Sequence, residues 1–172
     1  PRVVWGPRGG GLWVGDDTSI FRFTGGATWA REDRFESPVN ALAGTAHERW
    51  AGTASGLFRY EPPASRDGRP GEWLPAAPPS RLRVAPITSL LLTASKTLHA
   101  LGPAGLLRRS AAGDWRYDER LALDGGALRL HALGQTGADD ERVYAVGGRR
   151  GPEGRSSAVV LRIDDVVDAP PR

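Results

Sequence analysis

The chain has 172 residues, a formal net charge of +3 and no cysteine, and its 23 glycines and 14 prolines make up more than a fifth of it. This length suits one globular domain, and the lack of cysteine excludes a disulfide framework and a thiolate metal site. The basic residues are almost all arginines scattered along the chain, which argues against a nucleic-acid-binding patch. No apolar run approaches the ~20 residues of a membrane-spanning helix.

Short apolar runs bounded by glycine, proline, aspartate or serine predict an all-β protein. The runs at 12–14 and 87–92 are typical of this pattern, and no stretch has apolar residues at helical spacing. We therefore expect many short strands and no long helix.

One pattern occurs four times along the chain. A ring-bearing side chain, Trp13 in the first copy, is followed nine residues later by an arginine, Arg22. The later copies have Trp50 and Arg59, His99 and Arg108, and, after a longer loop, Tyr144 and Arg162. Proline opens three copies, at Pro1, Pro38 and Pro86, and tryptophan closes three, at Trp29, Trp73 and Trp115. The rings are 37, 49 and 45 residues apart, and a period of this size indicates a repeat array.

Each copy contains about four predicted strands, which is the content of a β-propeller blade. A β-sandwich has no reason to repeat a ring and an arginine at fixed places. We predict a single partial propeller with blades at approximately 1–37, 38–85, 86–127 and 128–172. The last copy lacks a convincing outer strand, so we expect a piece of a larger propeller of about six to eight blades. The apolar faces of the first and last blades should then drive self-association of the isolated segment.

Four segments resemble repeats of known propeller families. The stretches 11–23 and 49–60 resemble the repeats of two-component-regulator propellers, which are sensor propellers outside the membrane in bacterial signalling proteins. The segment 24–29 is similar to a degenerate Asp-box of sialidase- and sortilin-type propellers, with threonine replacing the signature aspartate, and 143–148 is similar to a kelch repeat. The resemblance implies a propeller fold, a sensor or scaffold role with further blades or signalling domains in the same chain, and a periplasmic or extracellular location.

The sequence contains no recognisable catalytic set. The three histidines lie in different strand contexts, no serine lies in a nucleophile elbow, and the three tyrosines fall at strand positions. His99 aligns with Trp13 and is predicted to pack between blades, and His47 lies in a turn and is given no role. The repeated arginines are predicted to pack on neighbouring blades. We therefore expect no enzyme, no catalytic residues, no metal site and no cofactor.

The candidate ligand site lies on the innermost strands, which line the central channel of a propeller. His131 aligns with Asn40 and Thr88 near the start of these strands, where polar side chains meet ligand or channel water. A hydrated channel lining without a specific ligand is the competing interpretation. Loop residues just before the inner strands complete the candidate set: Arg34, Glu36, Arg81 and Arg83.

Three hypotheses of function follow. The leading hypothesis is a non-catalytic recognition module that binds a small ligand, a glycan or a peptide on its channel face. The alternative is a fragment of a sialidase- or lyase-like propeller enzyme whose catalytic residues lie outside this segment. The third is a structural scaffold that binds no small ligand.

Overall fold

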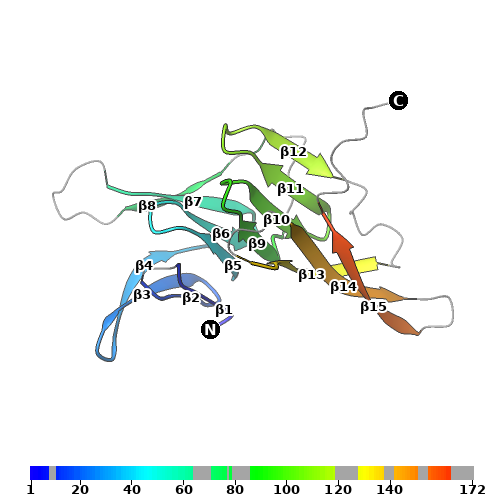
Figure 1. The fold of residues 1–172 in the computed structure, drawn as a ribbon. Coiled ribbons are helices and arrows are strands. Elements are labelled where there is room, and N and C mark those ends of the chain that lie inside the picture. Colours follow the sequence, from blue (N-terminus) through cyan, green and yellow to red (C-terminus); the bar gives the residue numbers. More distant parts are fainter. Residues whose placement is uncertain are drawn as a thin grey trace.

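The computed structural model describes residues 1–7, 11–63, 71–76, 78, 86–118, 128–137, 142–150 and 155–163. Every regular element in these ranges is a β-strand, and the strands form four antiparallel sheets (Figure 1). Three sheets have four strands and one has three. The predicted all-β propeller of about four blades is confirmed.

Each blade is one stretch of chain whose strands pair in sequence order. Blade 1 contains β1 (Val3–Trp5), β2 (Trp13–Gly15), β3 (Ser19–Gly25) and β4 (Thr28–Arg34). Blade 2 contains β5 (Val39–Gly44), β6 (Arg49–Thr53), β7 (Leu57–Glu61) and β8 (Glu72–Pro75). Blade 3 contains β9 (Ser89–Leu92), β10 (Leu98–Gly102), β11 (Gly105–Arg109) and β12 (Trp115–Asp118). Blade 4 contains β13 (Leu128–Gln135), β14 (Val143–Arg150) and β15 (Ser156–Arg162). The predicted lack of an outer strand in this blade falls on 164–172, outside the described residues.

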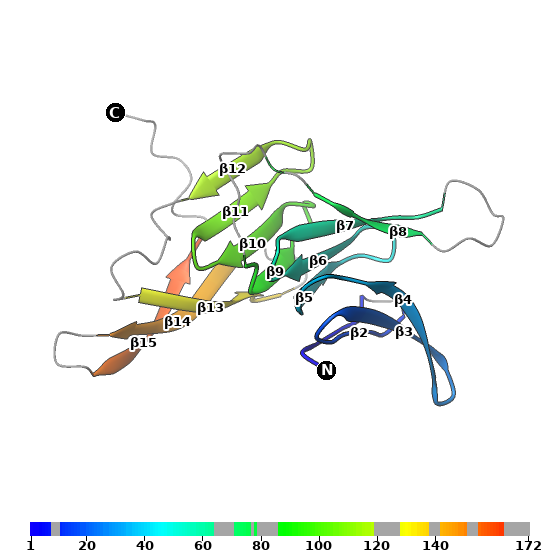
Figure 2. The same cartoon turned by 180° about the vertical axis from the view of Figure 1, so that it is seen from behind.

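The blades follow one another in an arc around a common centre (Figures 1 and 2). The inner strands β1, β5, β9 and β13 gather at this centre, each in contact with the next, and the outer strands lie at the periphery. Blades 1 and 4 are at the two ends of the arc in both views.

Alternate residues of the middle strands point to opposite neighbours, so each blade has two apolar faces. In β6, Trp50 packs toward blade 3 and the next residue, Ala51, packs toward blade 1. Three buried clusters result, one between each pair of neighbouring blades. The hydrophobic core therefore lies between the sheets, as it does in repeat arrays.

The glycine two residues after each tryptophan ring lets the next blade approach closely. A Cβ on Gly15 would lie 2.8 Å from a methyl group of Val39, and one on Gly52 would lie 2.4 Å from a methyl group of Ile87. Val39 and Ile87 begin the next blade and are fully buried. The repeated glycine thus determines how closely the blades pack.

The four repeated rings occupy one register position, each directly opposite its arginine. The Cα partners are Trp13 and Arg22, Trp50 and Arg59, His99 and Arg108, and Tyr144 and Arg162. Trp13, Trp50 and His99 are buried, as predicted. Tyr144 is half-buried, because the described part of the chain holds no blade that covers its face.

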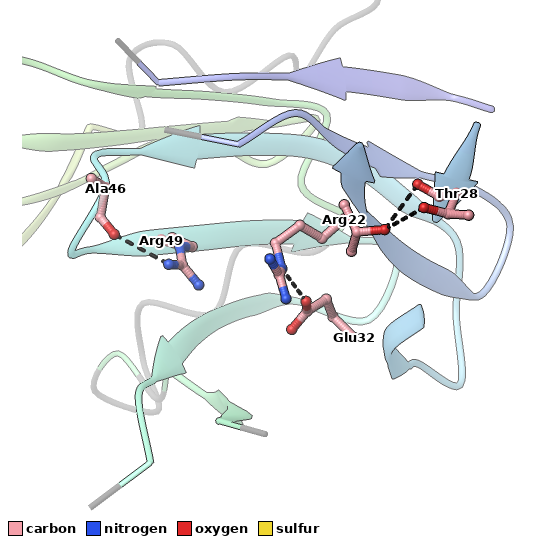
Figure 3. Close-up of polar contacts among 6 residues, drawn as sticks. Arg22, Thr28, Glu32, Ala46 and Arg49 are labelled. Atoms are coloured by element: carbon pink, nitrogen blue, oxygen red, sulfur yellow. Dashed lines mark hydrogen bonds and ion pairs between the residues drawn. The ribbon is translucent and has the colours of Figure 1, made fainter. Parts of the chain in front are cut away.

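A second arginine, from the following blade, also lies over each tryptophan ring. The Cζ atom of Arg22 is 5.9 Å from the Trp13 ring centroid, and that of Arg49 in blade 2 is 4.5 Å away. Arg49 is equally close to the ring of Tyr60, and its guanidinium donates to the Ala46 carbonyl (Figure 3). Cation–π contacts that are partly desolvated contribute up to about 2 kcal/mol each. The guanidinium of Arg49 therefore ties the first two blades together.

The seam between blades 2 and 3 repeats this arrangement. Arg59 lies 5.7 Å and Arg109 lies 5.5 Å from the Trp50 ring centroid, and Arg109 also lies over Trp115 at 5.8 Å. Arg49 precedes the ring on the second strand, whereas Arg109 follows the repeated arginine on the third strand. Arg49 and Arg109 thus reach equivalent tryptophan rings from different positions in their blades.

The Asp-box-like segment forms the hairpin between β3 and β4. Gly25 and Gly26 have positive φ values of 108° and 61°, which the turn requires. The hydroxyl oxygens of Thr24 and Thr28 are 2.8 Å apart. The Thr28 hydroxyl also donates to the Gly25 carbonyl at 2.7 Å (Thr28 is labelled in Figure 3). Threonine hydroxyls therefore close this turn, in which the Asp-box signature has an aspartate.

We expect Trp50→Ala to lower the free energy of unfolding by about 3–5 kcal/mol, the range for a buried large aromatic side chain. Trp50 is 1 % exposed and lies under two guanidinium groups. Trp29→Ala is the matched control, because Trp29 is 44 % exposed and its loss should cost much less. Denaturant unfolding measures both variants, and equal effects would contradict the assigned blade packing.

We expect Gly52→Ala to destabilise the fold by about 1–3 kcal/mol, because the new methyl group overlaps the Ile87 side chain and forces blades 2 and 3 apart. Gly134→Ala serves as the control, since a Cβ at Gly134 meets no atom within 4 Å. Thermal unfolding of the two variants tests the close approach; a tolerated Gly52→Ala would show that the blades are spaced by something else.

Candidate functional site

One residue of each blade lies three residues before the inner-strand residue that pairs with the repeated ring, either in the inner strand or just before it. We name these four residues the axial column: Arg2, Asn40, Thr88 and His131. Three of them are the predicted inner-strand site residues. The propeller repeat therefore places one polar residue per blade in the inner strand or just before it.

β-Bulges determine the direction of two of these side chains. The register of β5 on β6 shifts at Asn40, and that of β13 on β14 shifts at His131. A bulge inserts an extra residue and re-aims its side chain, which is common beside binding sites. Asn40 and His131 are thus the bulged residues of their inner strands.

The other two members of the column lie just before their strands. The N–H of Arg2 donates to the Gly15 carbonyl and that of Thr88 to the Leu101 carbonyl, each at 2.8 Å. Gly15 and Leu101 both follow the repeated ring by two residues, so the two hydrogen bonds are equivalent. This bond identifies Arg2 as the blade 1 member of the column.

The column is accessible although its chain neighbours are not. Arg2, Thr88 and His131 are exposed and Asn40 is half-buried. The residues directly before Asn40, Thr88 and His131 are only 0–4 % exposed and anchor the inner strands in the core. Asn40, Thr88 and His131 are therefore each preceded in the chain by a buried residue.

Hydrogen bonds hold two members of the column in place, one across blades and one within blade 3. The Asn40 side-chain amide donates to the Ile87 carbonyl at 3.1 Å, and the Thr88 hydroxyl donates to the Leu101 carbonyl at 3.2 Å. The Ser89 hydroxyl accepts the Leu133 N–H of blade 4 at 3.0 Å. His131 adds an imidazole, which can both donate and accept hydrogen bonds.

The face on which the inner strands begin, here the strand-start face, also carries the turns between second and third strands. The carboxylate of Asp16 accepts the N–H groups of Thr18 at 2.9 Å and Ser19 at 2.7 Å. The Thr18 backbone hydrogen bond is the main reason why the pKa of Asp16 lies below its ordinary value. In blade 2 the Thr53 hydroxyl accepts the corresponding N–H groups.

These turns connect directly to the next blade. The Asp16 carbonyl accepts the Val39 N–H at 3.1 Å, and the Thr53 carbonyl accepts the Ile87 N–H at 2.9 Å. Asp16 in blade 1 and Thr53 in blade 2 therefore play the same two parts. The side chain of each caps its own turn, and the carbonyl of each binds the start of the next blade. These backbone hydrogen bonds fix Val39 and Ile87, which directly precede Asn40 and Thr88 in the chain.

The predicted loop residues Arg34 and Glu36 are both exposed. Arg34 ends β4, and the buried Phe35 between the two donates its N–H to the β2–β3 turn. Both residues therefore lie on the strand-start face, and no contact links them to the column in the described residues. Arg81 and Arg83 lie outside the described residues.

Sequence reasoning missed Arg2. Aligning the opening prolines equates Asn40 with Val3, because blade 1 is one residue shorter at this point. Counting back from Trp5, which pairs with Trp13, identifies Arg2 instead. Its guanidinium forms an exposed ion pair with Asp17, of a kind that contributes little to stability.

Two further features are absent from the described ranges. No group of three histidine, cysteine, aspartate or glutamate side chains there could hold a metal ion. That part of the chain also has no helix of the length and apolarity needed to cross a membrane.

No protein-family model matches the chain, and no curated protein matches it. The two-component-regulator resemblance is therefore not confirmed beyond the propeller fold. The chain is similar in structure to a luciferin-regenerating enzyme, with a TM-score of 0.60 and 12 % identity over 84 % of this chain and 52 % of that one.

Two lyase structures are similar as well. A catalytically inactive histidine-to-alanine variant of virginiamycin B lyase from Staphylococcus aureus, with quinupristin, has a TM-score of 0.59 and 13 % identity over 92 % of this chain and 54 % of that one. A streptogramin B lyase has a TM-score of 0.56 and 14 % identity over 95 % and 55 %. The chain spans about half the length of these proteins.

These comparisons correct the prediction of function. The similar structures are enzymes, so a non-catalytic recognition module is wrong as the leading hypothesis, and the alternative of an enzyme fragment is favoured. They also weigh against the expectation that the protein is not an enzyme. The prediction rested on the lack of a recognisable catalytic set in these 172 residues.

We expect Asp16→Asn to flatten the dependence of stability on pH. The ionised Asp16 stabilises the fold because its pKa is lowered there, and this contribution is lost as the pH falls from the ordinary aspartate range through the lower folded value. Asparagine keeps the acceptor oxygen but does not titrate. Unfolding free energies between about pH 5 and 2 should fall more steeply for the wild type. Asp114→Asn is the control, and parallel curves for wild type and Asp16→Asn would contradict the prediction.

Proposed function

We propose that the chain is part of a lyase-like propeller enzyme and that the axial column contributes to its substrate site. The observation that carries the proposal is the likeness of fold to three propeller enzymes, two of them lyases. The column supports the location, because its residues lie in or just before the inner strands and three of the four are exposed. The remaining catalytic groups lie outside this segment, in keeping with its covering about half of those enzymes.

His131 is the candidate proton-transfer group of this segment. A lyase breaks a bond by taking a proton from one atom of the substrate and returning a proton to the leaving group, and an imidazole can do both. The inactive histidine-to-alanine lyase variant shows that the lyase itself depends on a histidine. In this chain His99 is buried between blades and His47 lies in a turn, whereas His131 is exposed at a bulge of an inner strand.

The other column members suit substrate binding rather than proton transfer. Asn40 and Thr88 use one donor each to hold the inner strands, which fixes their remaining polar atoms in place. Arg2 adds a positive charge beside them. Amide, hydroxyl and guanidinium groups together can donate hydrogen bonds to a carbonyl-rich ligand.

Quinupristin is the first probe, and calorimetry measures its binding to the purified chain. We expect His131→Ala to weaken binding by about tenfold, the effect of losing one good hydrogen bond in a site. Arg116→Ala is the control, because Arg116 is exposed on the outer strand β12. Absence of binding, or binding that is unchanged in His131→Ala, would contradict the proposal.

Mass spectrometry of the same mixtures distinguishes the reaction classes. A lyase product keeps the total mass of its substrate, whereas a sialidase-like hydrolase adds the mass of one water. A product that has gained water would replace the lyase proposal by the hydrolase one.

A further inference from the structure

The bulge that carries His131 differs from the other bulge of the inner strands. In β13, three residues pair with β14 before His131 and four pair with it afterwards. In β5, only Val39 pairs with β6 before Asn40. Arg2 and Thr88 lie just before their strands. His131 is therefore the column member that a paired strand holds over several residues on both sides.

Gly147 of β14 gives this bulge the space that it needs. A Cβ on Gly147 would overlap the Arg129 carbonyl oxygen and would lie 2.7 Å from the Cα of Leu130, and these are backbone atoms that cannot turn aside. Gly147 does not have a positive φ, so glycine is needed here for space and not for its conformational freedom. In the bulge of blade 2 the equivalent residue is Thr53, which carries a side chain. The close approach at Gly147 is therefore specific to the bulge of His131.

Ser89 of blade 3 holds the chain on the other side of the bulge. Its hydroxyl accepts the Leu133 N–H at 3.0 Å across the seam between blades 3 and 4, where β9 and β13 lie side by side (Figures 1 and 2). At the same place, directly after the column member, the other three blades have valine or alanine, whose side chains accept no hydrogen bond. Blade 3 thus has an acceptor at the seam that adjoins His131.

The imidazole of His131 depends on its backbone for its direction. His131 is exposed, so packing alone does not fix the direction of its ring. A proton-transfer group must nevertheless come within hydrogen-bond reach of a substrate atom, about 2.6–3.2 Å. Groups that hold a reactive side chain in place from behind are therefore as necessary as the side chain itself.

We propose that Gly147 and Ser89 are positioning residues for His131. Gly147 lets residues 129 and 130 approach β14 before the bulge, and Ser89 binds the backbone of Leu133 after it. Because the chain is fixed on both sides, the extra residue between them keeps one direction from the inner strand. The proposal rests on the proposed function for what the imidazole does there, whereas the positioning itself is a property of the protein without ligand.

NMR spectroscopy of the chain without ligand tests the positioning. Ser89→Ala removes the acceptor, so the Leu133 amide should exchange with solvent at least about tenfold faster, as expected for the loss of one hydrogen bond. The imidazole signal of His131, assigned by its loss in His131→Ala, should shift as well. Ser89→Thr keeps the hydroxyl and should return both signals toward the wild type. His47, in the turn between β5 and β6, is the internal control and should not shift.

Gly147→Ala should shift the same imidazole signal, because the new methyl group displaces the backbone before the bulge. Gly148→Ala is the matched control, since a Cβ at Gly148 meets only the Ser157 carbonyl oxygen, at an ordinary 3.6 Å. The Ser89 variants test the proposal by themselves if Gly147→Ala does not fold. An unchanged exchange rate of the Leu133 amide in Ser89→Ala, or a His131 signal that stays in place in the folded variants, would overturn the proposal.

Quinupristin binding separates positioning of His131 from a general loss of structure. We expect Ser89→Ala to weaken binding by up to about tenfold, the effect of losing the imidazole itself, and to have no further effect in a His131→Ala background. A merely structural role of Ser89 would weaken binding equally in both backgrounds, and that result would overturn the proposal. If the wild type does not bind quinupristin, the proposed function fails, while the NMR measurements still decide the positioning.

Discussion

The structure depends on how one blade covers the ring of the blade before it. A propeller blade is a small sheet with two apolar faces, which has no stable existence until both faces are packed. At the first two seams a tryptophan lies under guanidinium groups from both blades, and Arg49 also contacts Tyr60 in its own sheet. Burial of the tryptophan ring, cation–π attraction to it and the hydrogen bond of the arginine therefore all involve the atoms of one ring and one guanidinium.

This packing also explains the location of the candidate site. The glycine after each tryptophan admits Val39 or Ile87, and that buried residue anchors the polar residue that follows it. The position of the axial column therefore follows from the packing of neighbouring blades, and it recurs once in each blade. Its chemistry differs from blade to blade because the inward position carries no packing constraint, and a specific function requires such differences.

The fold could be predicted because ring and arginine are cross-strand partners. A spacing of nine residues between Trp13 and Arg22 encodes a hairpin, and its recurrence encodes the array. The arginines at the seams could not be predicted, because Arg49 and Arg109 meet their rings from different strands. Arg2 was missed because its blade lacks one residue before the column. The leading hypothesis of function was wrong because it rested on the lack of a recognisable catalytic set in the sequence, whereas the similar structures are enzymes.

The choice between an arginine and an apolar pair at each seam has a consequence for assembly order. A blade bearing tryptophan placed before blade 4 would meet Val143 and Ile163 and gain no cation. A blade bearing histidine placed before blade 2 would meet Arg49 with a poorer aromatic surface than tryptophan offers. Similar repeats in one chain invite exchange between neighbours during folding. The unequal seams therefore favour one order of the blades, because a blade placed before the wrong successor would lose the contacts just described.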